Sequence, residues 1–276
     1  MTDNVLRAMR VPLRMEAKVV CVYDDGAVVG TSLIGALGLS ILIDVDDERT
    51  LFDTGLRGRY LMHNLDQLEV DANTVDRIVI SHAHNAHVGG LEAFLSEREK
   101  GLEVIVTSDL KDMMPVKFLG LPVKKPPLSR MPAETLEKAH IKETIDWTQL
   151  SEHLFITGEG NGGSDTGVKE NSLVLMTAKG PAVICGCCHN GLLPLLSFVE
   201  EKTGKNVCAV VGGLHLLKAK KDYVYGIARS LKDDHGAPML HLDHCSGVRQ
   251  ITNLREKLGL KGVNEFYAGT EIIFTL

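Results

Sequence analysis

Ten residues decide the fold of this chain: Ser81-His82-Ala83-His84-Asn85-Ala86-His87-Val88-Gly89-Gly90. They follow the apolar run 77–80, which predicts a buried strand, and they precede residues 91–96, which predict a helix. Imidazole is a neutral nitrogen donor, and several are needed to hold a divalent ion of the zinc class. One histidine here would be an ordinary polar loop residue, whereas three within six residues predict a metal site at a strand end.

The composition is that of an ordinary globular protein with a mildly acidic surface. Of the 276 residues, 44% are hydrophobic and 24% are charged, which is enough for a sizeable core. Thirty basic and 36 acidic side chains argue against a general nucleic-acid binder. We therefore expect a small-molecule substrate and no nucleic-acid partner. The sequence leaves the oligomeric state open.

The chain has no feature that predicts a membrane or secreted protein. No apolar run reaches the length of a membrane span, and residues 1–14 carry both charge signs, unlike a signal peptide. The six cysteines show no framework spacing, and most lie in apolar, strand-like runs: Cys21, Cys185, Cys187, Cys188, Cys208 and Cys245. Reduced thiols of this kind predict a cytoplasmic protein.

The order of the predicted elements limits the architecture to two choices. Strand patterns fall at residues 18–23, 39–44, 51–52, 77–80, 102–107, 154–157, 172–177, 181–186, 207–211, 238–242 and 271–276, and helical patterns at 60–68, 91–96, 191–202, 218–231 and 248–258. Strands in two batches, each followed by helices, predict two packed sheets with helices outside. A doubly wound α/β fold would also fit. We expect one domain over residues 1–276, with an irregular proline-rich excursion at about 114–132.

Three later histidines also follow strand-like runs: His189, His215 and His244. A site assembled at one edge of a sheet sandwich requires this repeated arrangement. Asp53 ends an early strand just before Thr54 and Gly55, where a turn residue or helix cap is the ordinary interpretation. The remaining polar-context histidines are expected to be solvated: His63, His140, His153 and His235.

The histidine stretch resembles the His-x-His-x-Asp-His signature of the metallo-β-lactamase superfamily. Further motifs resemble one subgroup of it, the 7,8-dihydropterin-6-methyl-4-(β-D-ribofuranosyl)aminobenzene-5′-phosphate synthase-like proteins: Phe-Asp-Thr-Gly at 52–55, Gly-Cys-Cys-His-x-Gly at 186–191, Gly-Gly-Leu-His-Leu at 212–216 and His-Cys-Ser-Gly at 244–247. The resemblance runs from about Gly35 to Gly247. It favours the αββα four-layer sandwich, an α/β (α+β) fold, over the doubly wound alternative. The motifs specify the fold more than the reaction, because one scaffold carries many chemistries.

Carried over by position, the resemblance implies two metal positions. His82, His84 and His189 would form the first, and His87 and His244 would contribute to the second. Cys187 lies near where related enzymes place a bridging acid, and it could bind zinc as a thiolate, although a buried strand cysteine is the more common role. The resemblance gives two catalytic residues. Asp53 would fix the ring of a ligand histidine, and His215, if not simply a strand-end histidine, would face substrate or carry a proton.

Ala86 stands where the superfamily signature has aspartate. That aspartate holds the second ion together with the last histidine and orients the water, and alanine has no oxygen for either task. Three explanations are open: the protein works with one metal, it binds ligands without hydrolysis, or the alanine was introduced deliberately.

These features predict a metal-dependent, hydrolase-like enzyme that hydrolyses or transfers a phosphate ester or related small metabolite through a metal-bound hydroxide. Zinc, as one or two ions, is favoured because the donors are imidazoles with a possible thiolate; iron and manganese are alternatives. The subgroup implies a phosphorylated or pterin-like substrate. The alternative function is a ligand-binding protein of the same fold with an impaired metal site. A redox diiron protein fits less well, because His84 stands where that group has glutamate.

Overall fold

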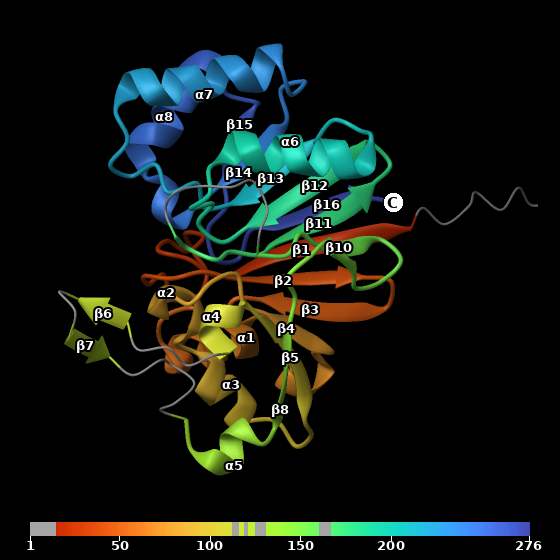
Figure 1. The fold of residues 1–276 in the computed structure, drawn as a ribbon, viewed down its shortest axis with the longest axis vertical. Coiled ribbons are helices and arrows are strands. Elements are labelled where there is room, and N and C mark those ends of the chain that lie inside the picture. The colour runs from red at the N-terminus through yellow and green to blue at the C-terminus, as the bar shows by residue number, and fades with distance from the viewer. Residues whose placement is uncertain (1–14, 112–115, 119–120, 125–130, 160–166) are drawn as a thin grey trace, which may run out of the picture.

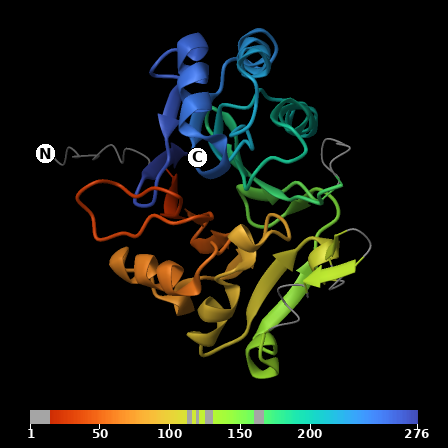
Figure 2. The ribbon, with the colours of Figure 1, turned by 90° about the vertical axis from the view of Figure 1, so that its left-hand side faces the viewer.

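A computed structural model describes residues 15–111, 116–118, 121–124, 131–159 and 167–276. Two seven-stranded sheets pack face to face, and helices cover the outer face of each (Figure 1). Figure 2 shows the same layers from the side, with the N-terminal part of the chain below and the C-terminal part above. The fold is the predicted αββα four-layer sandwich. The doubly wound alternative, which has a single central sheet, is wrong.

The first sheet joins antiparallel strands on one side to parallel strands on the other. Its order is β16-β1-β2-β3-β4-β5-β8, antiparallel from β16 to β3 and parallel from β3 to β8. The last strand of the chain therefore lies beside the first. The bounds are β1 Glu16–Tyr23, β2 Ser40–Val45, β3 Glu48–Phe52, β4 Arg77–Val79, β5 Leu102–Val106, β8 Ala139–Glu143 and β16 Glu271–Thr275.

The second sheet repeats this division. Its order is β15-β14-β13-β12-β11-β10-β9, antiparallel from β9 to β12 and parallel from β12 to β15. The bounds are β9 Thr148–Gln149, β10 Leu154–Ile156, β11 Ser172–Thr177, β12 Gly180–Cys185, β13 Ala209–Gly212, β14 Met239–Leu242 and β15 Val263–Glu265. The parallel strands of this sheet point their carboxyl ends to one edge of the sandwich.

Helices complete the outer layers. In the N-terminal part they are α1 Gly58–Gln67, η1 Ala72–Thr74, α2 Asn85–Val88, α3 Leu91–Ser96, α4 Ser108–Lys111 and α5 Ala133–Leu136. In the C-terminal part they are α6 Leu192–Thr203, α7 Lys221–Asp233, η3 His244–Ser246 and α8 Val248–Leu258. The three long C-terminal helices all lie over the second sheet (Figure 1).

Central strands are buried on both faces, which explains their continuous apolar runs. In β12, Ile184 faces the layer between the two sheets, whereas its neighbour Val183 faces α6 and the other outer helices. In β2, Ile41 faces the layer between the sheets and Leu42 faces the helices of the N-terminal part. Burial of these side chains is the main force that holds the four layers together.

The strands that the sequence analysis missed lie at or near sheet edges. β8 alternates between half-buried and exposed residues, and β15 has three residues of which only Val263 is buried. Neither carries the apolar run that identifies a central strand. The predicted proline-rich excursion at 114–132 falls partly outside the described residues. Its described part includes a two-stranded pair, β6 Val116–Phe118 and β7 Leu121–Lys124, apart from both main sheets (Figure 1).

Candidate metal centre

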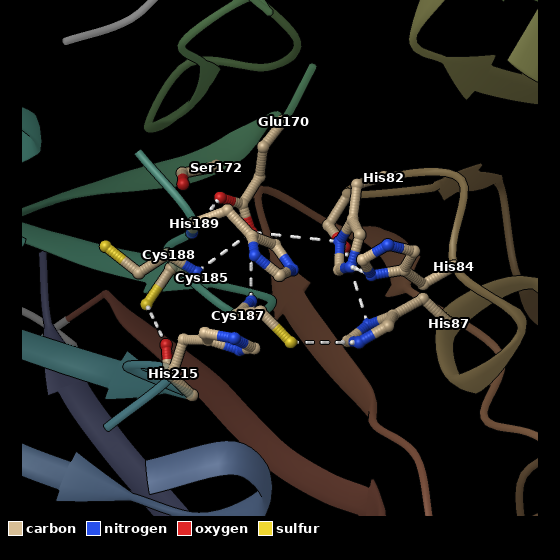
Figure 3. Close-up of polar contacts among 12 residues, drawn as sticks. His82, His84, His87, Glu170, Ser172, Cys185, Cys187, Cys188, His189 and His215 are labelled. Atoms are coloured by element: carbon tan, nitrogen blue, oxygen red, sulfur yellow. Dashed lines mark hydrogen bonds and ion pairs between the residues drawn. The ribbon is translucent and has the colours of Figure 1, made fainter. Parts of the chain in front are cut away.

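Parallel strands of both sheets end at one edge of the sandwich, and the predicted site residues follow them. β12, β13 and β14 are parallel neighbours, and Cys187, His215 and His244 come after their ends. β3 and β4 are parallel neighbours in the first sheet, and Asp53 and His82 come after them. Figure 3 shows His82 and His87, from the first sheet, facing Cys187 and His189, from the second. The strand ends therefore create the site from distant parts of the chain.

The histidine stretch folds back in a single helical turn. His84 immediately precedes α2, and the His87 N–H donates to the His84 carbonyl at 2.9 Å. The sequence analysis predicts only a loop here, so this turn is a correction. His82 Nε2 lies 2.9 Å from His84 Nδ1. Two nitrogen ligands of one tetrahedral zinc-class ion lie about 3.3 Å apart, so this pair is close to ligand spacing.

All five histidines predicted as metal ligands meet at this edge. The ring centroid of His189 lies 4.8 Å from that of His82 and 5.0 Å from that of His84. The His244 ring lies 5.2 Å from His87, and the His82 and His87 rings are 4.2 Å apart. The five imidazoles thus lie side by side at one edge, and their division between two ions stays a prediction.

Asp53 fixes the orientation of two of these rings. Its Oδ2 accepts hydrogen bonds from His87 Nδ1 at 2.6 Å and from the Ser81 hydroxyl at 2.7 Å. Because this hydroxyl donates to Asp53, it accepts from His82 Nδ1, which is 2.8 Å away. His82 and His87 therefore carry their proton on Nδ1 and present the Nε2 lone pair. Asp53 is completely buried, so it acts through these rings and not by touching substrate.

Cys187 lies between the two histidine groups. The donor atoms of His82, Cys187 and His189 lie within 4.8 Å of one another, and so do those of His87, Cys187 and His244. Its Sγ is 3.2 Å from His87 Nε2. The residue is buried, but it follows β12 instead of lying within it, so it is not an ordinary strand cysteine. It is the one residue of these five that can offer a negative charge.

Glu170 is a site residue that the sequence analysis missed. Its buried carboxylate accepts the backbone N–H groups of Cys187, Cys188 and His189 at 3.0, 2.9 and 2.6 Å. One of its oxygens lies 3.7 Å from His82 Nδ1. The carboxylate therefore shapes the loop that carries two donors. An acidic residue two positions before the strand pattern at 172–177 was the available signal.

Carboxylates also hold His244, and these too were missed. Asp24 Oδ1 accepts the His244 N–H at 2.7 Å, and Asp25 Oδ1 lies 3.2 Å from His244 Nδ1. Burial raises the pKa of Asp24 to about 6 and that of neighbouring Asp243 well above its usual range. The sequence analysis does not single out Asp24 and Asp25, because their contact with His244 spans almost the whole chain.

His215 lies at the exposed rim of the site. Its ring centroid is 4.4 Å from that of His189, and its backbone N–H donates to Cys245 Sγ at 3.1 Å. The side-chain hydrogen bond between Cys187 and Cys245 raises the pKa of Cys187 and lowers that of Cys245 well below its usual value. Contact with Cys245 in turn raises the pKa of His215. The exposed imidazole of His215 therefore holds a proton more readily than the imidazoles of His84 and His189, whose pKa values are lowered.

Backbone strain is concentrated at this edge. Four non-glycine residues here adopt left-handed conformations: Asp53, Cys188, His215 and His244, with φ of 63°, 56°, 50° and 43°. Such conformations are costly for residues with a Cβ, and they persist where the surrounding structure fixes them, commonly at functional sites. The backbone strain indicates that this edge of the sandwich is a candidate functional site.

The inner imidazoles are electrically suited to a cation. Burial, followed by neighbouring imidazoles, lowers the pKa of His82 well below its usual value and that of His189 to about 4. Both are therefore neutral at pH 7, the form that binds a metal. His189 Nε2 is buried without a hydrogen-bond partner among the described residues. A buried polar atom left unpaired is costly, so the donor set fits a divalent ion.

Two histidines expected to be solvated are instead paired. His235 is buried, and its Nδ1 lies 2.8 Å from Glu200 Oε2. His153 Nδ1 lies 2.7 Å from Asp46 Oδ1. Their acidic partners come from distant segments, which local sequence context does not reveal.

Comparison with known proteins gives the family. The model described as the metallo-beta-lactamase superfamily matches residues 34–188. The chain belongs to the metallo-β-lactamase superfamily. It is 25% identical over 260 residues to the 7,8-dihydropterin-6-methyl-4-(beta-D-ribofuranosyl)-aminobenzene-5′-phosphate synthase of Methanocaldococcus jannaschii, covering 84% of this chain and 88% of that protein. This similarity agrees with the subgroup that the sequence motifs resemble.

Solved structures share the architecture. Tm1679, described as a metal-dependent hydrolase of the beta-lactamase superfamily, aligns with a TM-score of 0.76 at 23% identity and covers 94% of this chain and 100% of its own. YhfI from Bacillus subtilis, a metallo-beta-lactamase fold protein, aligns with a TM-score of 0.63 at 14% identity and covers 94% and 99%. At these identities the likeness is one of fold.

The Asp53 contacts give a first prediction. In Asp53→Asn the amide nitrogen cannot accept from His87 or Ser81, so both rings lose their fixed orientation. We expect metal affinity to fall about 10–100-fold, as for other residues that orient metal-binding histidines. Competition with a chromophoric chelator measures it, and Asp66→Asn, on the exposed face of α1, is the matched control. Equal affinities in the two variants would contradict the orienting role.

The lowered pKa of His189 predicts a pH dependence of stability in the metal-stripped protein. Its pKa is about 4 when folded, against 6.5 as the usual value. Below about pH 6.5 the unfolded chain therefore binds more protons, and the free energy of unfolding falls as the pH drops toward 4. We expect the thermal midpoint to fall over this window, and to fall less in His189→Gln than in the wild type or exposed His140→Gln. Identical pH profiles for all three proteins, followed by circular dichroism, would refute this.

Proposed function

We propose that this chain is a metal-dependent enzyme that hydrolyses or transfers a phosphate ester or a related small metabolite at the edge described above. One observation carries the proposal: five imidazoles from three strand ends meet around one buried thiol, and Cys187 belongs to both donor groups. A packed core does not require this arrangement. Family membership supports the proposal, because the superfamily generally binds divalent metals.

His82, His84 and His189 would hold the first ion, and His87 and His244 the second, with Cys187 shared between them. Nitrogen and thiolate donors favour zinc over magnesium or calcium, and iron and manganese are the alternatives for metal analysis to separate. A bound ion of this kind supplies Lewis-acid chemistry, lowering the pKa of water and polarising an electrophile. The residues of the chain orient the metal ligands and supply the proton.

Asp53 and Ser81 keep the donor rings of His82 and His87 in one tautomer, and Glu170 holds the loop that carries Cys187 and His189. His215 is the proposed catalytic proton carrier. Its side chain is exposed, lies beside His189, and has a raised pKa because of Cys245. It is thus placed to donate a proton to a substrate oxygen or leaving group.

The substrate class follows from similarity and charge. The relative from Methanocaldococcus jannaschii is named for a pterin-containing phosphate, so we propose a small phosphorylated or pterin-like substrate. The net charge of −6 argues against a nucleic-acid substrate. The compartment we propose is the cytoplasm, since the six cysteines are all free thiols. Among the described residues, no helix combines the length and apolarity needed to cross a bilayer.

Ala86 supports a second candidate function, a ligand-binding protein that has lost turnover. The methyl group of alanine cannot coordinate an ion, so the second position depends on Cys187 for its negative charge. If Cys187 supplies that charge, its thiolate replaces the aspartate of the signature and the second metal position can still hold an ion. If it does not, the protein retains the fold and binds ligands only.

Metal content tests the proposed function. After expression in metal-supplemented medium, we expect at least about one equivalent of tightly bound transition metal by elemental analysis. His82→Ala/His189→Ala should lose most of it, and His140→Ala, exposed on edge strand β8, should not. Cys187→Ser should lose the more weakly held metal. Less than about one equivalent in the wild type would reject the metal-enzyme proposal.

Ala86→Asp separates the two candidate functions. Under the proposed function the wild type hydrolyses a chromogenic phosphodiester, and the variant changes kcat/KM by less than about tenfold, below 1.4 kcal/mol. Under ligand binding alone, the wild type is inactive and the aspartate creates activity. The assay uses metal-loaded protein, and Ala83→Asp, nearby in the same stretch, controls for an added carboxylate.

A further inference from the structure

A cavity of about 470 Å³ lies beside the candidate metal centre. It is formed by the loop before α6, the loop after β13, and the first turns of α7. Its volume is in the range of small-molecule sites, about 300–1,000 Å³. His189 and His215 line it as well as belonging to the metal centre, so a ligand in the cavity would extend toward the donor groups. His215 lies on the same side of the site as His189 in Figure 3.

The charge of this cavity is opposite to that of the whole chain. The net charge is −6, yet the cavity is lined by Lys218 and Lys220 and, among the described residues, by no carboxylate. Both lysines are exposed and can reach a ligand at its mouth. The neighbouring Lys221 instead pairs with Glu256 at 3.0 Å. Two lysines without a lining acid favour an anionic group.

The rest of the lining is apolar and aromatic. Leu192, Leu214 and Ile227 form the wall, and Tyr223, a residue that is 59% exposed, also lines the cavity. The N-termini of α6 and α7 lie at the cavity, and neither helix has a side-chain cap there. Uncapped N-termini carry partial positive charge and add to the field of the lysines.

We propose that this cavity is a substrate subsite in which Lys218 and Lys220 bind a phosphate group that is not the reacting group. The ligand class is a phosphomonoester of a flat ring compound, with the ring against Tyr223 and the apolar wall. The proposal rests on the proposed function, because the bound molecule is the substrate of the adjoining centre. It adds that the lysines determine specificity by holding the phosphate away from the metal donors.

Two probes test this on metal-loaded protein: guanosine 5′-monophosphate and guanosine, which differ only in the phosphate. Calorimetric titration should give tighter binding of the phosphorylated compound by about tenfold or more. Lys218→Gln/Lys220→Gln should remove most of that preference and change guanosine binding less than about twofold. Higher salt should weaken only the phosphorylated probe, because partly exposed charge pairs are screened.

The control has the same charge change elsewhere. Lys205→Gln/Lys261→Gln removes two exposed lysines, one just beyond the opposite end of α6 and one after α8. It should leave both affinities unchanged. No preference for the phosphate in the wild type, or an equal loss in the control variant, would overturn the proposal.

A metal-stripped sample distinguishes the lysines from the metal as the phosphate site. Under the proposal, the preference for the phosphorylated probe survives chelation of the metal and still depends on the lysines. In the opposite outcome, the preference is lost when the metal is removed and is unchanged in Lys218→Gln/Lys220→Gln. That result places the phosphate on the metal and rejects the subsite. A lysine-dependent preference in a protein with less than about one metal equivalent would keep the subsite and reject the proposed function instead.

Discussion

Asp53, which follows β3, fixes the segment that follows the neighbouring strand β4, and the candidate centre depends on that contact. Its carboxylate accepts the N–H and hydroxyl of Ser81 after β4, and it holds the His87 ring. The second sheet approaches the same point: a Cβ on Gly186, after β12, would lie 2.3 Å from Ser81 Oγ. The absence of a side chain at Gly186 thus lets the two halves close around the carboxylate. This approach brings Cys187 within reach of the histidines.

Charge balance is the second constraint on this site. The superfamily signature provides an aspartate between its histidines, and this chain has Ala86 there. The described donor groups contain a different source of negative charge, the hydrogen-bonded thiols of Cys187 and Cys245, whose contact raises the pKa of Cys187 and lowers that of Cys245. A thiolate at Cys245, or at Cys187 once a bound cation lowers its pKa, would offset positive charge at the centre. Carboxylates beside His244 add negative charge without occupying the centre.

The surroundings of the centre combine buried and exposed residues with different proposed tasks. Buried residues such as Asp53 and Glu170 fix the histidine rings and the cysteine loop, and exposed residues such as His215 and Lys218 are open to solvent, where the proposed substrate would bind. The first group is held by hydrogen bonds between distant segments, so it is rigid. The second lies on the loop after β13 and at the start of α7, where sequence can vary without disturbing either sheet. Because the exposed residues can change while the sheets stay the same, one scaffold can carry many reactions.

The sequence alone limited the architecture to two choices, because continuous apolar runs predict strands buried on both faces, and the resemblance of the His82–Gly90 stretch to the family signature favoured the four-layer sandwich. The strand-to-histidine pattern is local and marked the histidines of the candidate centre, and the resemblance selected five of them as metal ligands. Only the tertiary structure revealed the roles of Glu170, Asp24 and Asp25, and the position of Cys187 between the donor groups. Those contacts join residues far apart in the chain, and a local sequence pattern does not indicate which distant residue a side chain will contact. Packing of the two sheets decides that, because it sets which strand ends share an edge.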